Sequence, residues 1–424
     1  METLEVAGLW WMPTRPDHKV PGTLTFDLRH AGRLKLIGGL RTPLDRAEGF
    51  TDASTYGRLH GECRGRSFTL DGCFQLNLVG APSDPYEQVI YVNHAYEDVW
   101  FSADERAEAD GLDFDVDGLT EWVAQSGLEQ TFFQSPADGE PWVRLEGVAL
   151  PMREAELPGS GTATLGHKLS TKSRDTSLSL TESFSFKLAY DSNVAVPDLL
   201  DTASDIQDLV SLATDASAQF GFVRASHPDL AAAHGREFTV WSAWTALRKD
   251  GMQPPHDLFF TLDDIGGMNG FAEWMRVAEK YRSQLGRAMA TKYAERMYPS
   301  DKLLNCAAAL DGFHKTLTGK AEGPSFRNRI RQCIDIAGLQ FESLVHDPDE
   351  WTIELKHHRN EIAHHYGRRM GEATEQQLYI ADAAYWLLMF CLLRQASVPD
   401  STFDKLLSHQ KLRFLASKLR AIFC

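Results

Sequence analysis

Two different repeats of apolar and polar residues divide this chain. Up to about residue 190, short apolar segments lie between turn residues, and apolar and polar positions alternate within them, as at Leu24, Phe26 and Leu28. A repeat of two is typical of half-buried β-strands, and many short strands at regular spacing favour an antiparallel sandwich. We predict strands at residues 22–28, 33–37, 67–70, 75–79, 89–92, 143–148 and 183–189.

The middle of the chain mixes both repeats. Residues 196–215 have a helical repeat, and Asp198 after Pro197 offers an N-cap. The strand-like segments 219–223, 237–243 and 258–262 either extend the same sheet or form a small α/β connector. Residues 263–270 are dense in turn residues and predict a domain boundary.

From residue 271 onward every segment has a helical repeat, with short connections that favour an antiparallel bundle. The sequence therefore predicts an α+β multidomain protein, in which a β-sandwich-like N-terminal domain precedes a C-terminal all-α helical bundle. Its parts are a β-rich domain at 1–195, an α/β connector at 196–270 and the bundle at 271–424. The expected helices are 271–291, 300–317, 325–341, 349–366, 372–395 and 403–422.

Residues 378–393 form the most apolar run, which is 16 residues long and contains Asp382. A membrane span needs roughly 18–20 apolar residues, so we expect a buried core helix and no membrane partner. The six cysteines are scattered without a C-x-x-C pair, and the first residues lack the features of a signal peptide. We therefore expect a cytoplasmic protein with neither disulfides nor structural zinc.

Charge is distributed unevenly along the chain. The net charge is -16, but residues 271–424 hold 22 Lys and Arg against 18 Asp and Glu, a net +4. Residues 1–270 hold 21 against 41, a net -20. The acidic part would repel a phosphate backbone, whereas the C-terminal part tolerates one.

One polar stripe stands out in the predicted helix 349–366. Lys356, Asn360 and His364 recur every fourth residue, and Arg359 flanks them. These side chains have no apolar character to pack in a core, so they predict a site. The alternative is a solvated helix face with ion pairs to Glu361.

The residues Arg359-Asn360-x-x-x-His364 resemble the R-x(4–6)-H motif of HEPN domains, a superfamily of small helical bundles that includes many ribonucleases. The preceding segment 308–315 resembles a helix of the ApeA-type HEPN subgroup, although Asp311 stands where that helix usually has glutamate. The opening segments 8–13 and 20–24 resemble the ApeA N-terminal domain.

The resemblance implies a metal-independent endoribonuclease of a bacterial anti-phage, abortive-infection system, in effect a toxin that cleaves host RNA such as tRNA. In such a reaction the 2′-OH attacks the phosphate, His364 serves as the base, and Arg359 binds the phosphate oxygens. Asn360 either orients the imidazole or donates to the phosphate. Because His365 adjoins His364, the choice between the two imidazoles stays open. The N-terminal domain would be a sensor of a phage-derived trigger, and no cofactor is expected.

Arg359 and His364 are five residues apart, or about 140° around an ideal helix. One continuous helix cannot aim both at the same phosphate. Either the helix ends before His364, as Gly367 permits, or two copies share a site, as in HEPN ribonucleases. We therefore predict a homodimer or higher even oligomer through the HEPN domain.

Further residues are candidates for RNA or phosphate contacts, against the alternative of a solvated surface: Lys356, His365, Arg327, Arg331 and His314. Glu354, His357, His358 and Glu361 suggest a metal cluster. However, H-E-x-x-H is absent and Lys356 and Arg359 would repel a cation, so no metal is predicted.

Two other functions are consistent with the sequence. One is a catalytically silent HEPN module that binds a nucleotide or protein. The other is a ligand-binding β-sandwich, whose candidate aromatic residues are Trp10, Trp11, Trp100 and Trp142.

Overall fold

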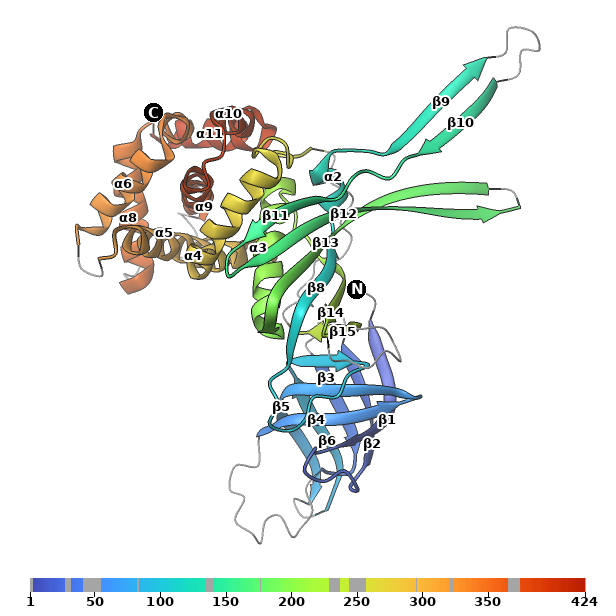
Figure 1. Cartoon of the computed structure of the whole chain (residues 1–424). Coiled ribbons are helices and arrows are strands. Elements are labelled where there is room, and N and C mark those ends of the chain that lie inside the picture. The colour runs from blue at the N-terminus through green and yellow to red at the C-terminus, as the bar shows by residue number, and fades with distance from the viewer. Residues whose placement is uncertain are drawn as a thin grey trace.

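The structure is a computed structural model of the whole chain. It describes residues 3–26, 32–40, 55–81, 84–134, 141–175, 177–228, 237–243, 257–294, 296–320, 323–364 and 374–423. A β-rich part leads into a helical part, as predicted (Figure 1).

The first strands close into a barrel, so the predicted sandwich is wrong for this part. Six antiparallel strands follow the order β5-β4-β1-β2-β3-β6, and pairing of β5 with β6 closes the ring. Closure leaves no free edge in the ring, which an open sandwich would have. The strands are β1 (Leu4–Trp11), β2 (Val20–Phe26), β3 (Gly32–Ile37), β4 (Thr55–Cys63), β5 (Arg66–Ala81) and β6 (Asp84–Val92).

The length of β5 explains why a sequence repeat could not distinguish barrel from sandwich. Its first half, from Phe68 to Asp71, pairs with β7 (His94–Glu97), which lies outside the ring, and its second half pairs with β6. Gly72 lies between the halves at a φ of +63°, and a Cβ there would meet the Asn93 side chain. Glycine adopts this backbone without strain, so β5 can change partners at this point.

An open antiparallel sheet continues from the barrel through β7 in the order β7-β15-β14-β8-β13-β12-β11. Because β14 and β15 lie inside it, the segment after residue 196 extends the main sheet and is not a separate connector. Residues 258–262 are not a strand; their buried side chains pack beside helices. The strands are β8 (Glu108–Val116), β11 (Arg153–Leu157), β12 (Gly161–Arg174), β13 (Ser177–Ala195), β14 (Phe220–Ser226) and β15 (Glu237–Ser242).

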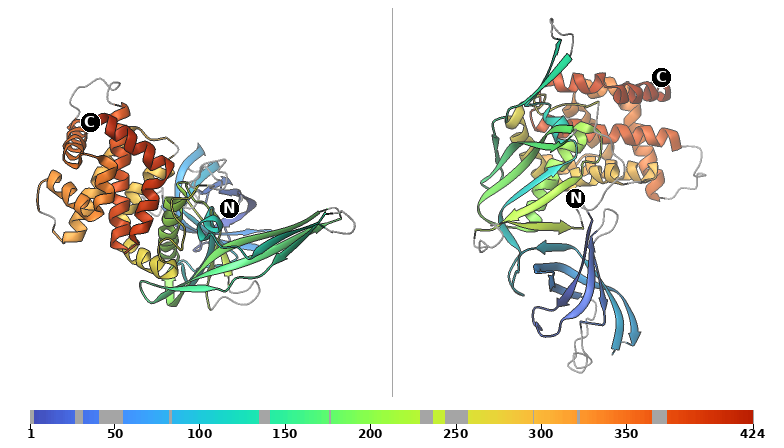
Figure 2. Two further views of the ribbon diagram at one scale, coloured as in Figure 1. Left: turned by 90° about the horizontal axis from the view of Figure 1, so that it is seen from above. Right: turned by 90° about the vertical axis from the view of Figure 1, so that its right-hand side faces the viewer.

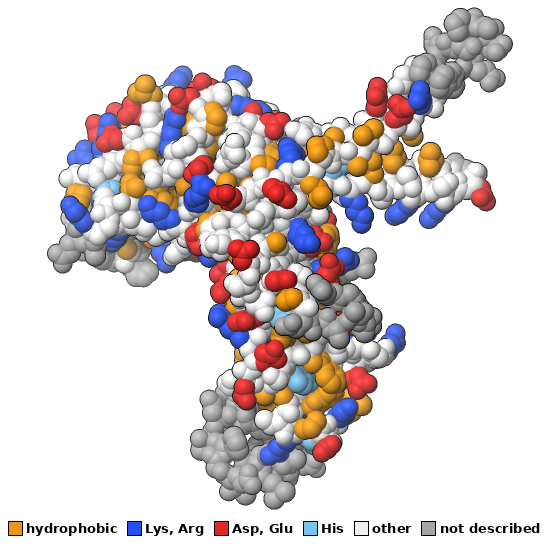
Figure 3. All heavy atoms as spheres, viewed as in Figure 1, with side chains coloured by type: hydrophobic (Ala, Val, Ile, Leu, Met, Phe, Trp, Pro, Cys, Tyr) orange, Lys and Arg blue, Asp and Glu red, His pale blue; other side chains and the backbone are white. Residues whose placement is uncertain are grey.

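Two long hairpins extend away from the helices, one from this sheet and one as a separate two-stranded sheet (Figures 1 and 2). One is formed by the far ends of β12 and β13, and the other by β9 (Leu128–Gln134) and β10 (Pro141–Gly147). Apolar side chains lie exposed along them, including Phe132 and Leu178 (Figure 3). Glu182 accepts a hydrogen bond from the Gly127 N–H at 2.9 Å and so joins the bases of the two hairpins.

Two helices accompany the sheet and eight form the helical part, among the described residues. The predicted helix 325–341 is broken at Gly338, whose φ is +83°, and the predicted helix 403–422 at His409, which has an extended ψ of 140°. The helices are α2 (Leu119–Val123), α3 (Val196–Thr214), α4 (Gly267–Tyr293), α5 (Pro299–Thr318), α6 (Phe326–Ala337), α7 (Leu339–Val345), α8 (Pro348–His364), α9 (Thr374–Gln395), α10 (Asp400–Ser408) and α11 (Gln410–Phe423).

Buried side chains form two cores whose border differs from the predicted domain borders. One core fills the barrel, and the other runs without interruption from the open sheet through α3 into the helical bundle. Phe186 of β13 stacks on Phe271 of α4 at 5.0 Å between ring centroids. The open sheet and the helices therefore pack as one unit.

Helix α9 is the apolar segment singled out in the sequence. By length and composition residues Glu375–Gln395 could cross a membrane, but 72% of the apolar stretch is buried inside the protein. Burial of this kind is what a core helix of a bundle shows.

Acidic residues of α3 face basic and phenolic residues of α4 across the junction. Arg282 donates to Asp205 at 2.6 Å, and the Tyr293 hydroxyl donates to Asp208. Burial raises the pKa of Asp205 to about 6, despite the guanidinium, and that of Asp208 to about 7. Lys292 pairs with Asp215 at the end of α3.

Candidate functional site

Helix α8 carries the predicted catalytic residues and is continuous from Pro348 to His364. The Asp347 side chain caps its start by accepting from the backbone N–H groups of Asp349 and Glu350, at 3.1 and 3.0 Å. The cap is thus Asp347, and the helix begins one residue before the predicted start at residue 349. Trp351, Leu355 and His358 are buried and anchor one face of the helix in the bundle.

Arg359 and Asn360 lie together at the edge of that buried face. The Arg359 guanidinium lies 4.9 Å from the centre of the Phe326 ring of α6, and its Nη1 donates to Asn360 Oδ1 at 3.1 Å. A cation over an aromatic face is held by the ring quadrupole, which orients the guanidinium. The role of Phe326 could not be predicted from residue spacing, because the contact joins two helices.

The explanation that the helix ends before His364 loses support, because α8 continues to position 364. With α8 unbroken, positions 359 and 364 lie about 140° apart around an ideal helix. The side chain of His364, together with His365 and Gly367, lies outside the described residues.

The two candidate arginines of α6 differ in how available they are to a phosphate group. Arg327 is exposed and has no ion pair among the residues that the structure describes. Arg331 lies 3.5–3.7 Å from three carboxylates, Asp335, Glu342 and Asp349, which compete with a phosphate. We therefore retain Arg327 as the stronger phosphate-binding candidate of the pair.

His314 is only 3% exposed, so it cannot touch RNA directly in this conformation. Its Nε2 contacts Gln332 Oε1, and its Nδ1 has no hydrogen-bond partner among the described residues. One turn away, Asp311 pairs with Lys315 at 2.7 Å and with Arg329 at 2.5 Å. Burial acts to raise the pKa of Asp311, but both cations outweigh it and the pKa lies below its usual value.

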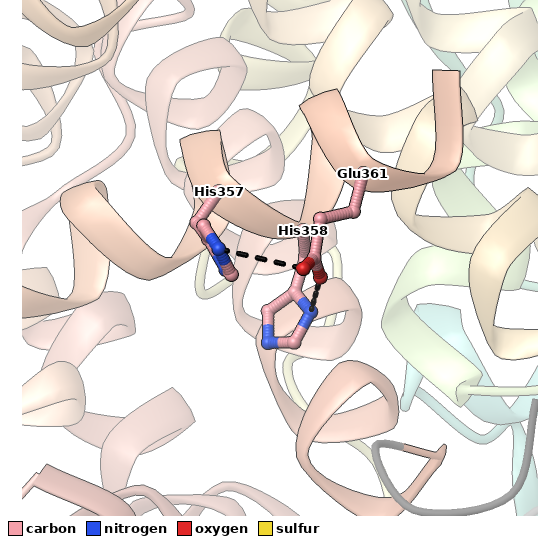
Figure 4. Close-up of side chains that lie close together, drawn as sticks. All are labelled: His357, His358 and Glu361. Carbon is pink, nitrogen blue, oxygen red and sulfur yellow. Dashed lines mark ion pairs between the residues drawn. The ribbon is translucent and has the colours of Figure 1, made fainter. Parts of the chain in front are cut away.

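A second group of polar side chains gathers on α8. His357, His358 and Glu361 converge so that one nitrogen or oxygen from each lies within 4.8 Å of the others (Figure 4). Lys356 is exposed, while the Arg359 guanidinium is directed toward Phe326. The cations expected to repel a metal thus lie on other faces of the helix.

The aromatic residues proposed for ligand binding in the β-rich part have mixed placements. Trp10 and Trp11 are buried, whereas Trp100 is 52% exposed and stacks on His60 at 5.8 Å. The Trp142 side chain lies outside the described residues. Trp10 and Trp11 therefore serve mainly the barrel itself.

Comparison with known proteins concerns mostly the β-rich part. A family model described as ApeA N-terminal domain 1 matches residues 5–274, which is more than half of the chain. It covers the barrel, the open sheet, α3 and the first turns of α4, and ends well before α8. No curated protein and no solved structure matches the chain.

Proposed function

Because the chain belongs to the ApeA N-terminal domain 1 family, which is associated with anti-phage defence, we propose that it is a metal-independent endoribonuclease. Its helical part would be a HEPN domain that cleaves host RNA, with tRNA the first substrate to test. The β-rich part would sense a phage-derived trigger. Cleavage would stop growth of the infected cell from within the cytoplasm.

The observation that carries this proposal is the pairing of Arg359 with Asn360 on an unbroken α8. Phe326 and Asn360 hold the guanidinium, which is a permanently charged fork suited to phosphate oxygens. Position 364 comes one turn after Asn360, where a histidine can take the proton from a 2′-OH. The product would carry a 2′,3′-cyclic phosphate.

Divergence of Arg359 and His364 on one helix favours a site made by two copies. In a two-fold dimer, Arg359 of one copy can approach His364 of the other, and symmetry then creates the arrangement twice. The net charge of +4 on residues 271–424 makes this the part of the chain suited to RNA.

The test is cleavage of total RNA by purified protein in EDTA. The reaction also contains lysate from phage-infected cells, and this lysate is heated beforehand to remove its nucleases. Arg359→Ala and His364→Ala are each expected to lower cleavage by about 100-fold or more. Arg413→Ala, which removes an exposed arginine on α11, is the matched control and should retain activity.

Growth after phage infection of cells that express each variant gives the second measurement. Unchanged growth arrest in both motif variants, together with no cleavage in vitro, would reject the nuclease and favour a binding module. Cleavage that stops in EDTA would reject the metal-independent mechanism.

A further inference from the structure

The cluster of His357, His358 and Glu361 on α8 has the composition and spacing of a metal site. Glu361 reaches toward both histidines, with Oε1 3.5 Å from His357 Nε2 and Oε2 3.9 Å from His358 Nδ1 (Figure 4). In a tetrahedral zinc site the ligand atoms are about 3.4 Å apart, given bonds of about 2.0–2.2 Å. Small side-chain rotations would therefore bring all three ligands onto one ion.

Helical geometry explains why these residues converge. Glu361 follows His357 by four residues and His358 by three, so it lies one turn above the gap between them. Arg359 lies on another face, where its guanidinium is directed toward Phe326. A cation between the histidines would thus be stabilised by the carboxylate of Glu361 without a nearby guanidinium.

A fourth residue, Glu354, lies beside the ring nitrogen of His358 that faces away from Glu361. Glu354 Oε2 lies 3.6 Å from His358 Nε2, on the opposite edge of the ring from Glu361. Metal-binding histidines commonly direct their second ring nitrogen to a carboxylate, which fixes the tautomer and orients the ring. Gln377 Nε2 lies 3.5 Å from His358 Nδ1, so an ion bound to that nitrogen would displace this contact.

We propose that His357, His358 and Glu361 bind one divalent transition-metal ion of the Zn²⁺ class, with Glu354 orienting His358. Two imidazoles and one carboxylate suit Zn²⁺ and leave a fourth position for water. His357 is exposed, so the site is open to solvent, whereas His358 is 3% exposed and fixed by the bundle.

The site has a consequence that rests on the proposed nuclease function. Position 364 follows Glu361 by three residues and His357 by seven, so it belongs to the same face of the helix. A bound divalent ion adds positive charge to that face, which opposes the uptake of a proton by a base there. The metal is therefore expected to inhibit RNA cleavage.

Metal binding is measured directly, without reference to activity. Full-length protein is stripped with EDTA, freed of chelator and titrated with ZnCl₂ by calorimetry, and Co²⁺ is added separately to record its visible absorption. We expect one Zn²⁺ per chain and a Co²⁺ spectrum of low coordination number. Absence of a saturable site in the wild type overturns the proposal.

Variants identify the ligands. His357→Ala and Glu361→Gln should each weaken Zn²⁺ binding by about 100-fold, and Glu354→Gln by about 10-fold. Glu350→Gln is the matched control, because it makes the same substitution at an exposed residue of α8 outside the cluster. Circular dichroism verifies folding, and we avoid His358 because it is buried. Equal binding by Glu361→Gln and Glu350→Gln contradicts the assignment.

The activity measurement separates this site from the nuclease proposal. One equivalent of Zn²⁺ should inhibit cleavage by wild type and by Glu350→Gln, but not by Glu361→Gln. Saturable Zn²⁺ binding by a protein that cleaves no RNA would support the metal site and reject the nuclease. RNA cleavage by a protein that does not bind Zn²⁺ would support the nuclease and reject the metal site.

Discussion

The β-rich residues 1–270 and the helical residues 271–424 differ in charge, by -20 against +4, yet the open sheet of the first part shares one core with the helices. The acidic excess is used in part at their junction, where α3 presents carboxylates to Arg282, Lys292 and Tyr293 of α4. Charge asymmetry therefore has a structural consequence. The ion pairs help to fasten the open sheet and the helices together, so a change in the sheet has a direct route to the bundle.

The largest expected effect concerns the shared core. Phe271→Ala removes the ring that stacks on Phe186 and should lower the free energy of unfolding by about 4 kcal/mol. Leu24→Ala, in the separate barrel core, should cost about 3 kcal/mol. Hydrogen exchange with mass spectrometry should show Phe271→Ala loosening both β13 and α5, and Leu24→Ala loosening only barrel strands. Loosening of the helices alone by Phe271→Ala would contradict a shared core.

The next effect concerns the ion pair between α3 and α4. Arg282→Ala leaves Asp205, whose side chain is 3% exposed, without its cation. We expect a loss of about 3 kcal/mol in urea unfolding. Arg276→Ala on the same helix removes an exposed pair with Glu273 and should cost less than about 0.5 kcal/mol. Equal losses in the two variants would mean that the junction is not held by the buried pair.

The smallest effect is a pH dependence at Asp208, whose pKa burial raises from 3.8 to about 7. Between these values the folded state binds a proton that the unfolded state has released. The stability that this group contributes therefore falls as pH rises through that window. The Asp208→Asn variant lacks this pH dependence. Its free energy of unfolding relative to that of the wild type should therefore rise by about 2 kcal/mol between pH 5 and pH 8. Parallel stability curves for the two proteins would contradict this.

The sequence predicted local structure in both parts but not how the strands close. The helices after residue 271 and the helix at 196–215 were found from their repeat and are confirmed, apart from breaks at Gly338 and His409. The barrel was not predicted because its closure depends on β5 changing partners at Gly72. Apolar and polar residues alternate in the same way in the strands of a barrel and of a sandwich. The strand predicted at 258–262 was wrong, because an apolar run can pack beside helices without pairing.

At the candidate site, residue spacing was informative only within one helix. The stripe on α8 and the turn-by-turn relation of Glu354, His358 and Glu361 can be read from the sequence. Phe326 beneath Arg359, the burial of His314 and the carboxylates around Arg331 cannot, because each depends on a second helix or on packing. Catalytic roles for Arg359, Asn360 and His364 stay predictions.

The central claim is that α8 supplies half of a site that two copies complete. Arg359→Ala and His364→Ala chains, carrying different affinity tags, can be co-expressed and the mixed dimer isolated by two successive purifications. The mixed dimer would contain one composite site with both Arg359 and His364 intact, so we predict about half of wild-type cleavage in EDTA. A mixed dimer as inactive as each parent variant would contradict the shared site.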